Sequence, residues 1–304
     1  MSEPFRHPAL FYRTLDEYLD VTLPFIVEGL AAGAPVAVAV PGTKLEPLRA
    51  GLAGSSGRVQ LIDMTRAGRN PGRILPGVLF AFADAHRDAE NVRIIGEPIW
   101  PGRTAVEYPA CVQHEALINQ AFAGRNVEIL CPYDAALPHD VLQDAERTHP
   151  TVIDPAGSRA SSRYAPDQVL AEYNEALPAP PGASALLVDG TMLSEARAFA
   201  MAEARLAGLS PDRSDDFEFA VSELITNSIE HARSRCVLRM WVDEGHLVGE
   251  VSDTGRLHDP LAGRRPAPPE QTRGRGLLLI NHLTDLVRIH RSDQGTTIRV
   301  YLRI

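Results

Sequence analysis

The stretch ELITNSIEHA, residues 223–232, closes a helical pattern that begins near Ser214. Apolar residues recur along this pattern at three- and four-residue steps, which places them on one face of an α-helix. That face consists of Phe217, Ala220, Val221, Leu224 and Ile225. The segment therefore predicts an amphipathic helix that packs against a core, with polar side chains along its edge.

Glu223 and Asn227 share that edge, because helical residues four positions apart are neighbours. The side-chain oxygen of Asn227 is a suitable ligand for Mg²⁺, which prefers oxygen and usually keeps waters and substrate phosphates as well. The carboxylate of Glu223, one turn earlier, is suited to accept a proton from a hydroxyl nucleophile. Taken alone, the helix favours a plainer interpretation, in which both are boundary residues of a surface helix.

Three glycine-containing segments follow this helix and change that balance. VSDTG (251–255) places Asp253 after an apolar strand, where a carboxylate can accept a hydrogen bond from an amine such as that of adenine. GRGL (274–277) opens a predicted helix whose first N–H groups can approach phosphates. GTT (295–297) begins the last predicted strand, where it fits a plain hairpin turn equally well.

In this order the segments resemble the N, G1, G2 and G3 boxes of the GHKL ATPases, a superfamily that includes histidine kinases and anti-sigma kinases. The resemblance covers roughly residues 185–304, and the compact layout looks like the RsbW-type anti-sigma serine kinases. It implies that Glu223 is a general base, that Asn227 binds Mg²⁺, and that Asp253 binds adenine. The other implied ATP contacts are Gly255, Gly274, Arg275, Gly276, Leu277 and either Thr296 or Thr297, with Gly274 and Gly276 along the triphosphate.

Residue Leu257 departs from that family pattern, because the G1 box often carries a second glycine at this position. A side chain there restricts the positive-φ conformations open to glycine, which puts the mobility of the ATP lid (256–273) and turnover in question. The prolines in this stretch stiffen it further; they are Pro260, Pro266, Pro268 and Pro269.

His231 lies on the same helix edge, one turn beyond Asn227. Because it sits on the ATP-binding helix itself, it is a poor candidate for a phosphoacceptor, and no histidine occurs between His149 and His231. We expect it to pack at the helix C-terminus, where a partly positive ring is favoured.

The order of elements predicts two domains of different class. In the first half, the apolar runs 35–40, 59–64, 92–97 and 127–132 alternate with helical patterns, which indicates an α/β domain with a mostly parallel sheet. In the second half, two helices precede two hairpins, which indicates an α+β (Bergerat-type) sandwich over 185–304. The Pro-, Ala-, Ser- and Gly-rich stretch 154–184 is expected to be a linker interrupted by a short helix, which leaves 1–153 as the first domain.

The first domain resembles the MEDS sensory domain over residues 7–150, which implies a RecA-like sheet without a P-loop and a ligand-sensing role. Polar clusters follow the predicted strands, where such folds bind ligands. The candidates for a small-molecule pocket are Arg73, Glu97, Arg103, His114, Cys131, Asp134 and His149. A metal site that draws on Glu115 as well is a further alternative, but the spacing fits no zinc pattern; a purely structural network or a docking surface is the third.

Composition narrows the function classes. The net charge of −9 argues against a nucleic-acid partner, because phosphate-binding surfaces need clustered Lys and Arg. The N-terminus lacks the apolar run of a signal peptide or membrane span. The three cysteines form no CxxC pair, which indicates a reduced, cytoplasmic protein without a membrane partner.

The resemblances together imply a partner-switching regulator. Its kinase domain would bind ATP and Mg²⁺ and phosphorylate a Ser or Thr of a STAS-type anti-sigma antagonist, with a sigma factor as second partner and a possible homodimer. The alternative is a module that binds ATP and sequesters its partner without phosphate transfer, as Leu257 and the prolines suggest. A sensor histidine kinase is disfavoured because the phosphoacceptor helix is missing.

Overall fold

A computed structural model describes residues 5–232, 235–267 and 274–304. The chain divides into two compact units, an N-terminal unit of Met1–Tyr173 and a C-terminal unit of Asn174–Ile304.

An eight-stranded sheet forms the centre of the N-terminal unit, in the order β4-β3-β5-β6-β2-β7-β8, with β1 paired to β6. Every pair is parallel except the β7–β8 hairpin. The strands are β1 (Phe5–Arg6), β2 (Pro8–Tyr12), β3 (Val36–Val40), β4 (Val59–Asp63), β5 (Val92–Gly96), β6 (Val127–Asp134), β7 (Thr151–Asp154) and β8 (Gly157–Ala160). The four apolar runs predicted as parallel strands are β3 to β6, which confirms the α/β class.

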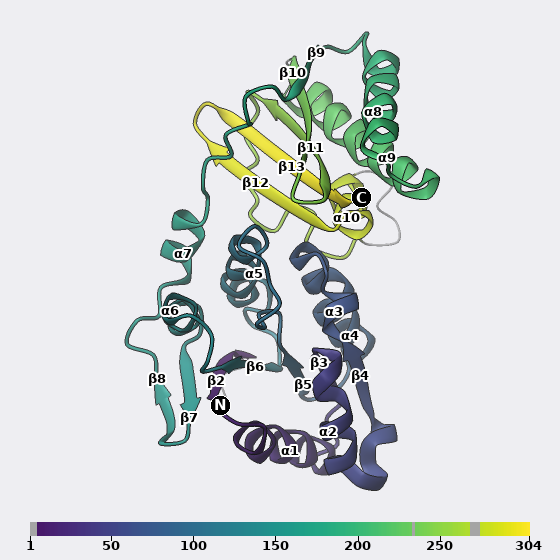
Figure 1. The fold of residues 1–304 in the computed structure, drawn as a ribbon. Helices are drawn as coiled ribbons and strands as arrows, with labels where there is room; N and C mark the ends of the chain where they lie inside the picture. The colour runs from purple at the N-terminus through teal and green to yellow at the C-terminus, as the bar shows by residue number, and fades with distance from the viewer. Residues whose placement is uncertain (1–4, 233–234, 268–273) are drawn as a thin grey trace. The chain divides into compact units, whose positions relative to one another are not determined.

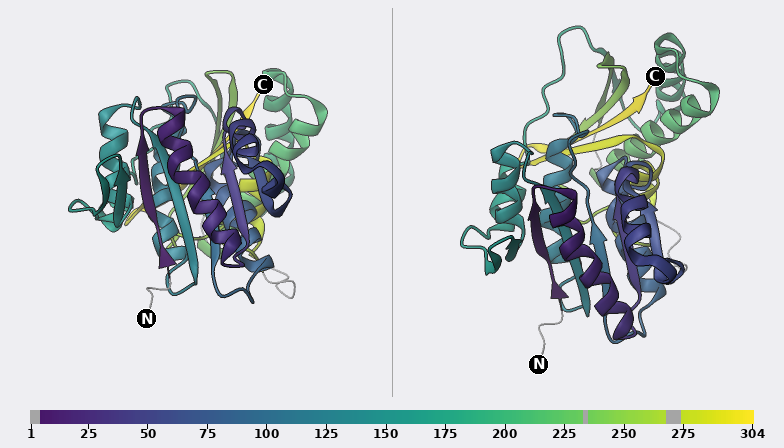
Figure 2. Two further views of the ribbon diagram at one scale, coloured as in Figure 1. Left: turned by 90° about the horizontal axis from the view of Figure 1, so that it is seen from below. Right: turned by 60° about the horizontal axis from the view of Figure 1, so that its bottom comes forward.

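Helices cover both faces of this sheet (Figure 2). Because side chains alternate along a strand, Leu130 points to the face covered by α1 and α2, whereas Cys131 points to the opposite face, toward α5. The helical segments are α1 (Leu15–Ala31), α2 (Gly42–Leu52), η1 (Ala53–Arg58), α3 (Met64–Ala67), η2 (Pro71–Arg73), η3 (Leu75–Phe80), α4 (Ala81–Ala85), α5 (Tyr108–Ala121), α6 (His139–Thr148) and α7 (Pro166–Glu172).

Sequence reasoning missed the central strand β2, whose sequence is PALFY. It lies between β6 and β7 and is almost fully buried. Its first residue, Pro8, lacks a backbone N–H, and a proline at the start of a run reads as a break more readily than as a central strand. The stretch 154–184 is also more ordered than a linker, because β8 and α7 belong to the N-terminal unit.

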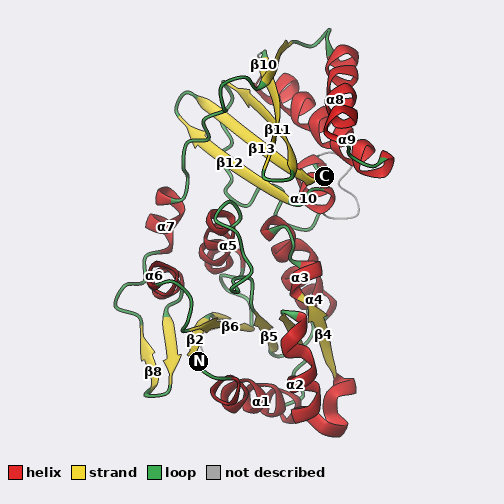
Figure 3. Cartoon of the chain, in the orientation of Figure 1, coloured by secondary structure: helices red, strands yellow, loops and turns green. Residues whose placement is uncertain are grey.

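The C-terminal unit is a five-stranded antiparallel sheet in the order β12-β13-β11-β10-β9 with helices on one face (Figures 1 and 3). Its strands are β9 (Ser184–Val188), β10 (Cys236–Asp243), β11 (His246–Asp253), β12 (Leu286–Ser292) and β13 (Gly295–Arg303). Its helical segments are α8 (Leu193–Ala207), α9 (Pro211–Asn227), η4 (Ser228–Ala232) and α10 (Gly276–Leu283). This arrangement confirms the predicted α+β sandwich.

The core of the C-terminal unit lies between that sheet and the three α-helices. The predicted stripe of α9 is buried, with Phe217, Ala220 and Ile225 completely inaccessible to solvent. The short edge strand β9 was missed. Only alternate residues of β9 are shielded, and its exposed Leu187 gives the stretch no clear pattern.

The opposite face of this sheet is covered in part by residues 174–178. Arg299 donates to the carbonyl oxygens of Leu177 (2.9 Å) and Pro178 (3.2 Å). The side chain of Asn174 donates to Arg291 O (2.7 Å) and accepts from Arg291 N (2.9 Å), as a neighbouring strand would. The chain therefore attaches to the sheet before β9 begins.

Candidate functional site

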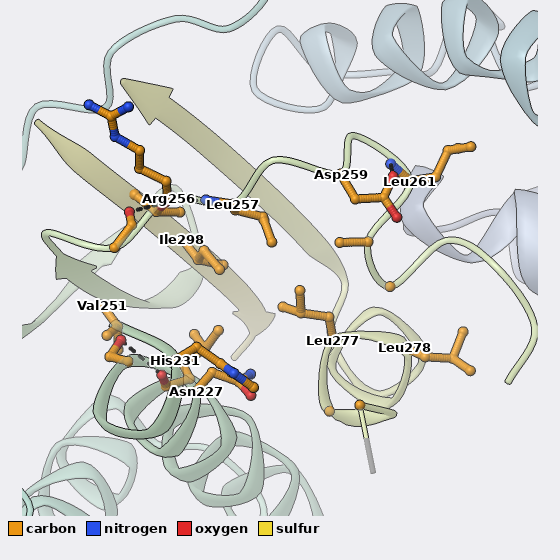
Figure 4. A pocket seen from close by; sticks show the side chains of 18 of the residues that line it. Asn227, His231, Val251, Arg256, Leu257, Asp259, Leu261, Leu277, Leu278 and Ile298 are labelled. Atoms are coloured by element: carbon orange, nitrogen blue, oxygen red, sulfur yellow. Dashed lines mark hydrogen bonds between the residues drawn. The ribbon is translucent and has the colours of Figure 1, made fainter. Parts of the chain in front are cut away.

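A cavity of about 770 Å³ opens in the C-terminal unit (Figure 4). Five segments contribute to its wall: the end of α9 with η4, the end of β11, the loop 255–267, the start of α10 and the start of β13. These are the segments that carry the four sequence boxes. Residues separated by about 70 positions in the sequence are thus brought to one place.

The helix α9 places Asn227 at this cavity, and its hydrogen-bonding pattern changes directly afterwards. The α-helix ends at Asn227, and residues 228–232 continue as a single π-helical turn. Such turns are rare and occur frequently at functional sites. Asn227 is therefore the last α-helical residue before a local widening of the helix.

Glu223 points toward the first residue of α10, Gly276. A methyl group on Gly276 would lie 2.5 Å from Glu223 Oε2, so a side chain there would displace the carboxylate from its present place. The positive end of the α10 dipole favours a negative charge at this place. The helix segment that carries Glu223 and the glycine segment that carries Gly276 are therefore in contact in the folded chain, although 52 residues separate these two positions in sequence.

The expectation for His231 was wrong. His231 is exposed and lines the cavity instead of packing at the helix end. The reason is the π-turn, which adds a residue to the helical repeat and rotates the positions that follow Asn227.

Asp253, at the end of β11, is held by two hydrogen bonds. Its Oδ1 accepts from the backbone N–H of Gly255 (2.6 Å), and its Oδ2 accepts from the hydroxyl of Ser228 (2.5 Å). Because each carboxylate oxygen has two lone pairs, both oxygens keep an acceptor site. Sequence reasoning missed Ser228, which follows Asn227 directly and carries no motif of its own.

The start of β13 supports the same corner. Thr296 pairs with Asp253 across the ladder, donates to Gly255 O (2.8 Å) and accepts from Leu257 N (3.2 Å). Thr296 lines the cavity, whereas Thr297 points to the other face of the sheet, because side chains alternate along a strand. Of the two threonines, the geometry therefore favours Thr296.

Gly295 has no room for a side chain. A Cβ there would lie 1.9 Å from the carbonyl oxygen of Asp253, and the φ of Gly295 is +148°. Both conditions exclude other residues, so the close approach of β13 to β11 at Asp253 depends on this glycine.

The described part of the lid, 256–267, contacts the start of α10. The backbone of Gly263 lies against Leu277, and Asn281 donates to Gly263 O at 3.1 Å. Leu257 faces the cavity with Leu277 (Figure 4), and its φ is not positive, so a side chain is accommodated without backbone strain. Pro260 and Pro266 belong to this part, whereas Pro268 and Pro269 lie outside the described residues.

Gly274 and Gly276 both line the cavity, and Gly274 adopts a φ of +79° immediately before α10. Arg275 is the N-cap residue of α10, and Leu277 lies in the first turn. The predicted residues of the second glycine box therefore surround the N-terminus of this helix.

Comparison with known proteins adds two matches. Residues 188–302 match the histidine kinase-like ATPase domain, and residues 6–150 match MEDS, the methanogen/methylotroph DcmR sensory domain. The chain joins a MEDS domain to a histidine kinase-like ATPase domain.

The ATPase domain has a curated relative, the serine-protein kinase RsbW of Bacillus licheniformis, at 34% identity over 105 residues. The match takes in 30% of this chain and 65% of the relative's length. A crystal structure of RsbU and RsbW domains from Mycobacterium tuberculosis overlaps with a TM-score of 0.32 at 20% identity, over 41% of this chain and 33% of that chain.

In the MEDS domain, the predicted sensory residues divide into separate groups. Glu97, at the end of β5, is completely buried and lies 2.5 Å from Lys44 Nζ, with Tyr12 OH at 3.4 Å. Burial raises the pKa of Glu97 to about 7, although Lys44 opposes the shift. Asp134, whose charge also raises that pKa, caps a turn by accepting from Ala136 N at 2.8 Å.

Other candidates have structural partners. Arg103 donates to the carbonyl oxygens of Gly68 (2.6 Å), Arg69 (2.9 Å) and Pro98 (2.9 Å), so it ties two loops together. Arg73 ends the short helix η2, and His114 is buried within α5. The sensory role of these residues stays a prediction.

Cys131 and His149 do come together in the MEDS domain, on the face of the sheet covered by α5. They meet Glu115, named above among the metal alternatives, and His7, which sequence reasoning missed.

Among the described residues of both domains, no helix is long and apolar enough to cross a membrane.

Proposed function

We propose that this chain is an anti-sigma regulator with serine/threonine kinase activity. Its ATPase domain would bind ATP with Mg²⁺ and phosphorylate a Ser or Thr of a STAS-type antagonist, and it would also bind a sigma factor. The cavity that joins Asp253 at one side to Asn227 and Gly276 at the other carries this proposal. The relative RsbW, described as a serine-protein kinase, supports it.

The residues present fit ATP. A cavity of about 770 Å³ has the size of sites that enclose drug-sized ligands. Asp253 keeps acceptor sites for the exocyclic amine of adenine after its bonds to Ser228 and Gly255. Leu257 and Ile298 add apolar surface for the base, and the N-terminus of α10 favours phosphate.

The proposed mechanism relies on positioning. Bound Mg²⁺ would neutralise charge on the triphosphate, and Asn227 would hold it through an amide oxygen. Glu223 would accept the proton of the substrate hydroxyl. Its carboxylate already lies beside Gly276, so the base and the phosphate-binding turn are next to each other before substrate binds.

The test is an Asn227→Ala variant, assayed for phosphate transfer from ATP to a STAS-type protein. We expect a loss of about 100-fold, since removing one group that stabilises transition-state charge has effects of that size. Glu230→Ala, an exposed position on the next turn, is the matched control and keeps full activity.

A second candidate function is sequestration without phosphate transfer, and Leu257 in the cavity wall favours it. The wild-type chain distinguishes the two. If it binds ATP and captures a sigma factor but phosphorylates no STAS-type protein, the kinase proposal is wrong and the sequestration function stands.

A further inference from the structure

Four buried side chains with metal-ligating atoms meet in the MEDS domain, far in sequence from one another. His7 lies between β1 and β2, Glu115 is on α5, Cys131 is on β6, and His149 is the C-cap residue of α6. Each is at most 1% exposed, and one ligand atom from each lies within 4.8 Å of all the others. So small a space holds a single atom and excludes an organic ligand.

The contacts within this cluster have the spacing of a coordination shell. Glu115 Oε2 lies 3.3 Å from His7 Nε2 and 3.0 Å from His149 Nε2, and Cys131 Sγ lies 3.4 Å from His7 Nε2. With metal–ligand bonds of about 2.0–2.3 Å, the atoms of a tetrahedral zinc site are about 3.3–3.7 Å apart. The cluster thus has nearly the size that the ion requires.

The hydrogen bond at Nδ1 of His149 determines which ring nitrogen carries the lone pair. His149 Nδ1 lies 2.8 Å from Ala145 O, and because a carbonyl oxygen only accepts, Nδ1 carries the proton. In the neutral imidazole Nε2 is then unprotonated, and it points at the carboxylate of Glu115.

His7 is held in the same way through Asn119. The amide nitrogen of Asn119 donates to Thr148 O (2.8 Å), so its oxygen faces His7 Nδ1 at 3.1 Å and requires a proton there. Metal-ligating histidines commonly donate their outer N–H to such partners.

With both rings neutral, two nitrogen lone pairs face the same carboxylate. Neither oxygen of Glu115 accepts a hydrogen bond of good geometry among the described residues, although both are buried. Acceptors at 3.0–3.3 Å from one another repel unless a cation lies between them. A proton on one of the two rings would relieve only one of these contacts, whereas a single metal ion accepts both nitrogen atoms and the carboxylate at once.

We propose that His7, Glu115, Cys131 and His149 bind one divalent transition-metal ion, with zinc as the natural occupant. A mixed set of imidazole, thiolate and carboxylate suits Zn²⁺ better than Mg²⁺ or Ca²⁺, which prefer oxygen alone. Four protein ligands leave no open position, so the site is structural. It fastens the N-terminal segment to α5, β6 and the end of α6, around the central strand β2.

The experiment uses the full chain without nucleotide. We expect about one zinc per chain by elemental analysis after dialysis, and a higher midpoint of thermal unfolding with zinc than after chelation. Replacement by Co²⁺ is expected to give a thiolate-to-cobalt charge-transfer band, which reports a cysteine ligand. None of the described residues that line the nucleotide site is a cysteine.

The variants separate ligation from folding. Cys131→Ser is expected to lose the cobalt band and to lower zinc affinity at least about 100-fold, whereas Cys111→Ser, another buried cysteine of the same domain, keeps both. Asn119→Ala keeps all four ligands but frees His7, and is expected to weaken zinc binding about 10- to 100-fold. A folded wild-type chain that takes up neither Zn²⁺ nor Co²⁺, or that shows the same cobalt spectrum in Cys131→Ser, overturns the proposal.

Discussion

In the ATPase domain, residues from four sequence boxes line a cavity of about 770 Å³. In the MEDS domain, His7, Glu115, Cys131 and His149 are packed within 4.8 Å of one another and are shielded from solvent. The first arrangement leaves space for a nucleotide, and the second leaves space for one ion. Substitutions in the open site are therefore expected to change activity, and substitutions in the buried groups are expected to change stability.

The largest expected effect is a loss of stability from a substitution at the open site, where the other substitutions are expected to change activity. In Gly295→Ala, the new Cβ meets Asp253 O at 1.9 Å, and both atoms belong to the sheet, so neither can move away cheaply. We expect a loss of about 3 kcal/mol or more in the free energy of unfolding, measured by urea denaturation. Gly245→Ala is the control: its φ is also positive (+76°), but no atom lies within 4 Å, so the cost is about 1 kcal/mol. An equal loss of unfolding free energy in the two variants would show that the fold relieves the clash between the new Cβ and Asp253 O.

The next effect tests the open site by activity. In Glu223→Gln, the side chain keeps its size but is no longer a base, so phosphate transfer to a STAS-type protein is expected to fall about 100-fold. ATP affinity and the unfolding midpoint stay unchanged. Glu230→Gln, exposed one turn beyond Asn227, serves as control. Unaltered transfer in Glu223→Gln would remove this residue from the mechanism.

A smaller effect is expected at the adenine side. In Asp253→Asn, the amide oxygen still accepts from Gly255, but one acceptor is replaced by an N–H group that opposes the amine of adenine. We expect ATP affinity to fall about 10- to 100-fold by calorimetry, since hydrogen bonds to charged groups contribute about 1.5–3 kcal/mol. Asp293→Asn, whose side chain is almost fully exposed, should bind ATP normally. Normal affinity in both variants would mean that Asp253 does not contact the base.

The smallest effect concerns the ion pair between buried Glu97 and partly buried Lys44. Because the pKa of Glu97 is raised to about 7 in the fold, the folded chain binds this proton more tightly than the unfolded chain. Its contribution to stability is therefore fully present below about pH 4.5 and is lost as pH rises through about 7. Glu97→Gln should remove this part of the pH dependence of urea unfolding between pH 5 and 8. A slope identical to that of the wild type would contradict the assignment.

The sequence predicted which segments meet at the cavity of the ATPase domain, because they come as short motifs with a fixed order. The roles of their residues in ATP binding stay predictions. The sequence did not distinguish Thr296 from Thr297, since that choice depends on the pairing of Asp253 with Thr296 across the sheet. It also missed Ser228, and it misplaced His231, because a π-turn is not visible in apolar spacing.

The MEDS domain was harder for a physical reason. His7 is 108 residues from Glu115 and 142 residues from His149, so only the order of strands in the sheet brings them together. Zinc-like spacing is a local signal, and this cluster has none. The parallel strands β3 to β6 were predictable, because their sequences are nearly continuous apolar runs.

The segment that precedes β9 matters for anyone who wishes to produce the ATPase domain by itself. A fragment that starts at residue 185 would lose Glu175, which pairs with Arg288 at 2.9 Å, and the carbonyl groups that receive Arg299. Arg288 on β12 and Arg299 on β13 would then lose these partners. Cloning from Asn174 retains these contacts, so the proper start of the domain lies well before its first strand.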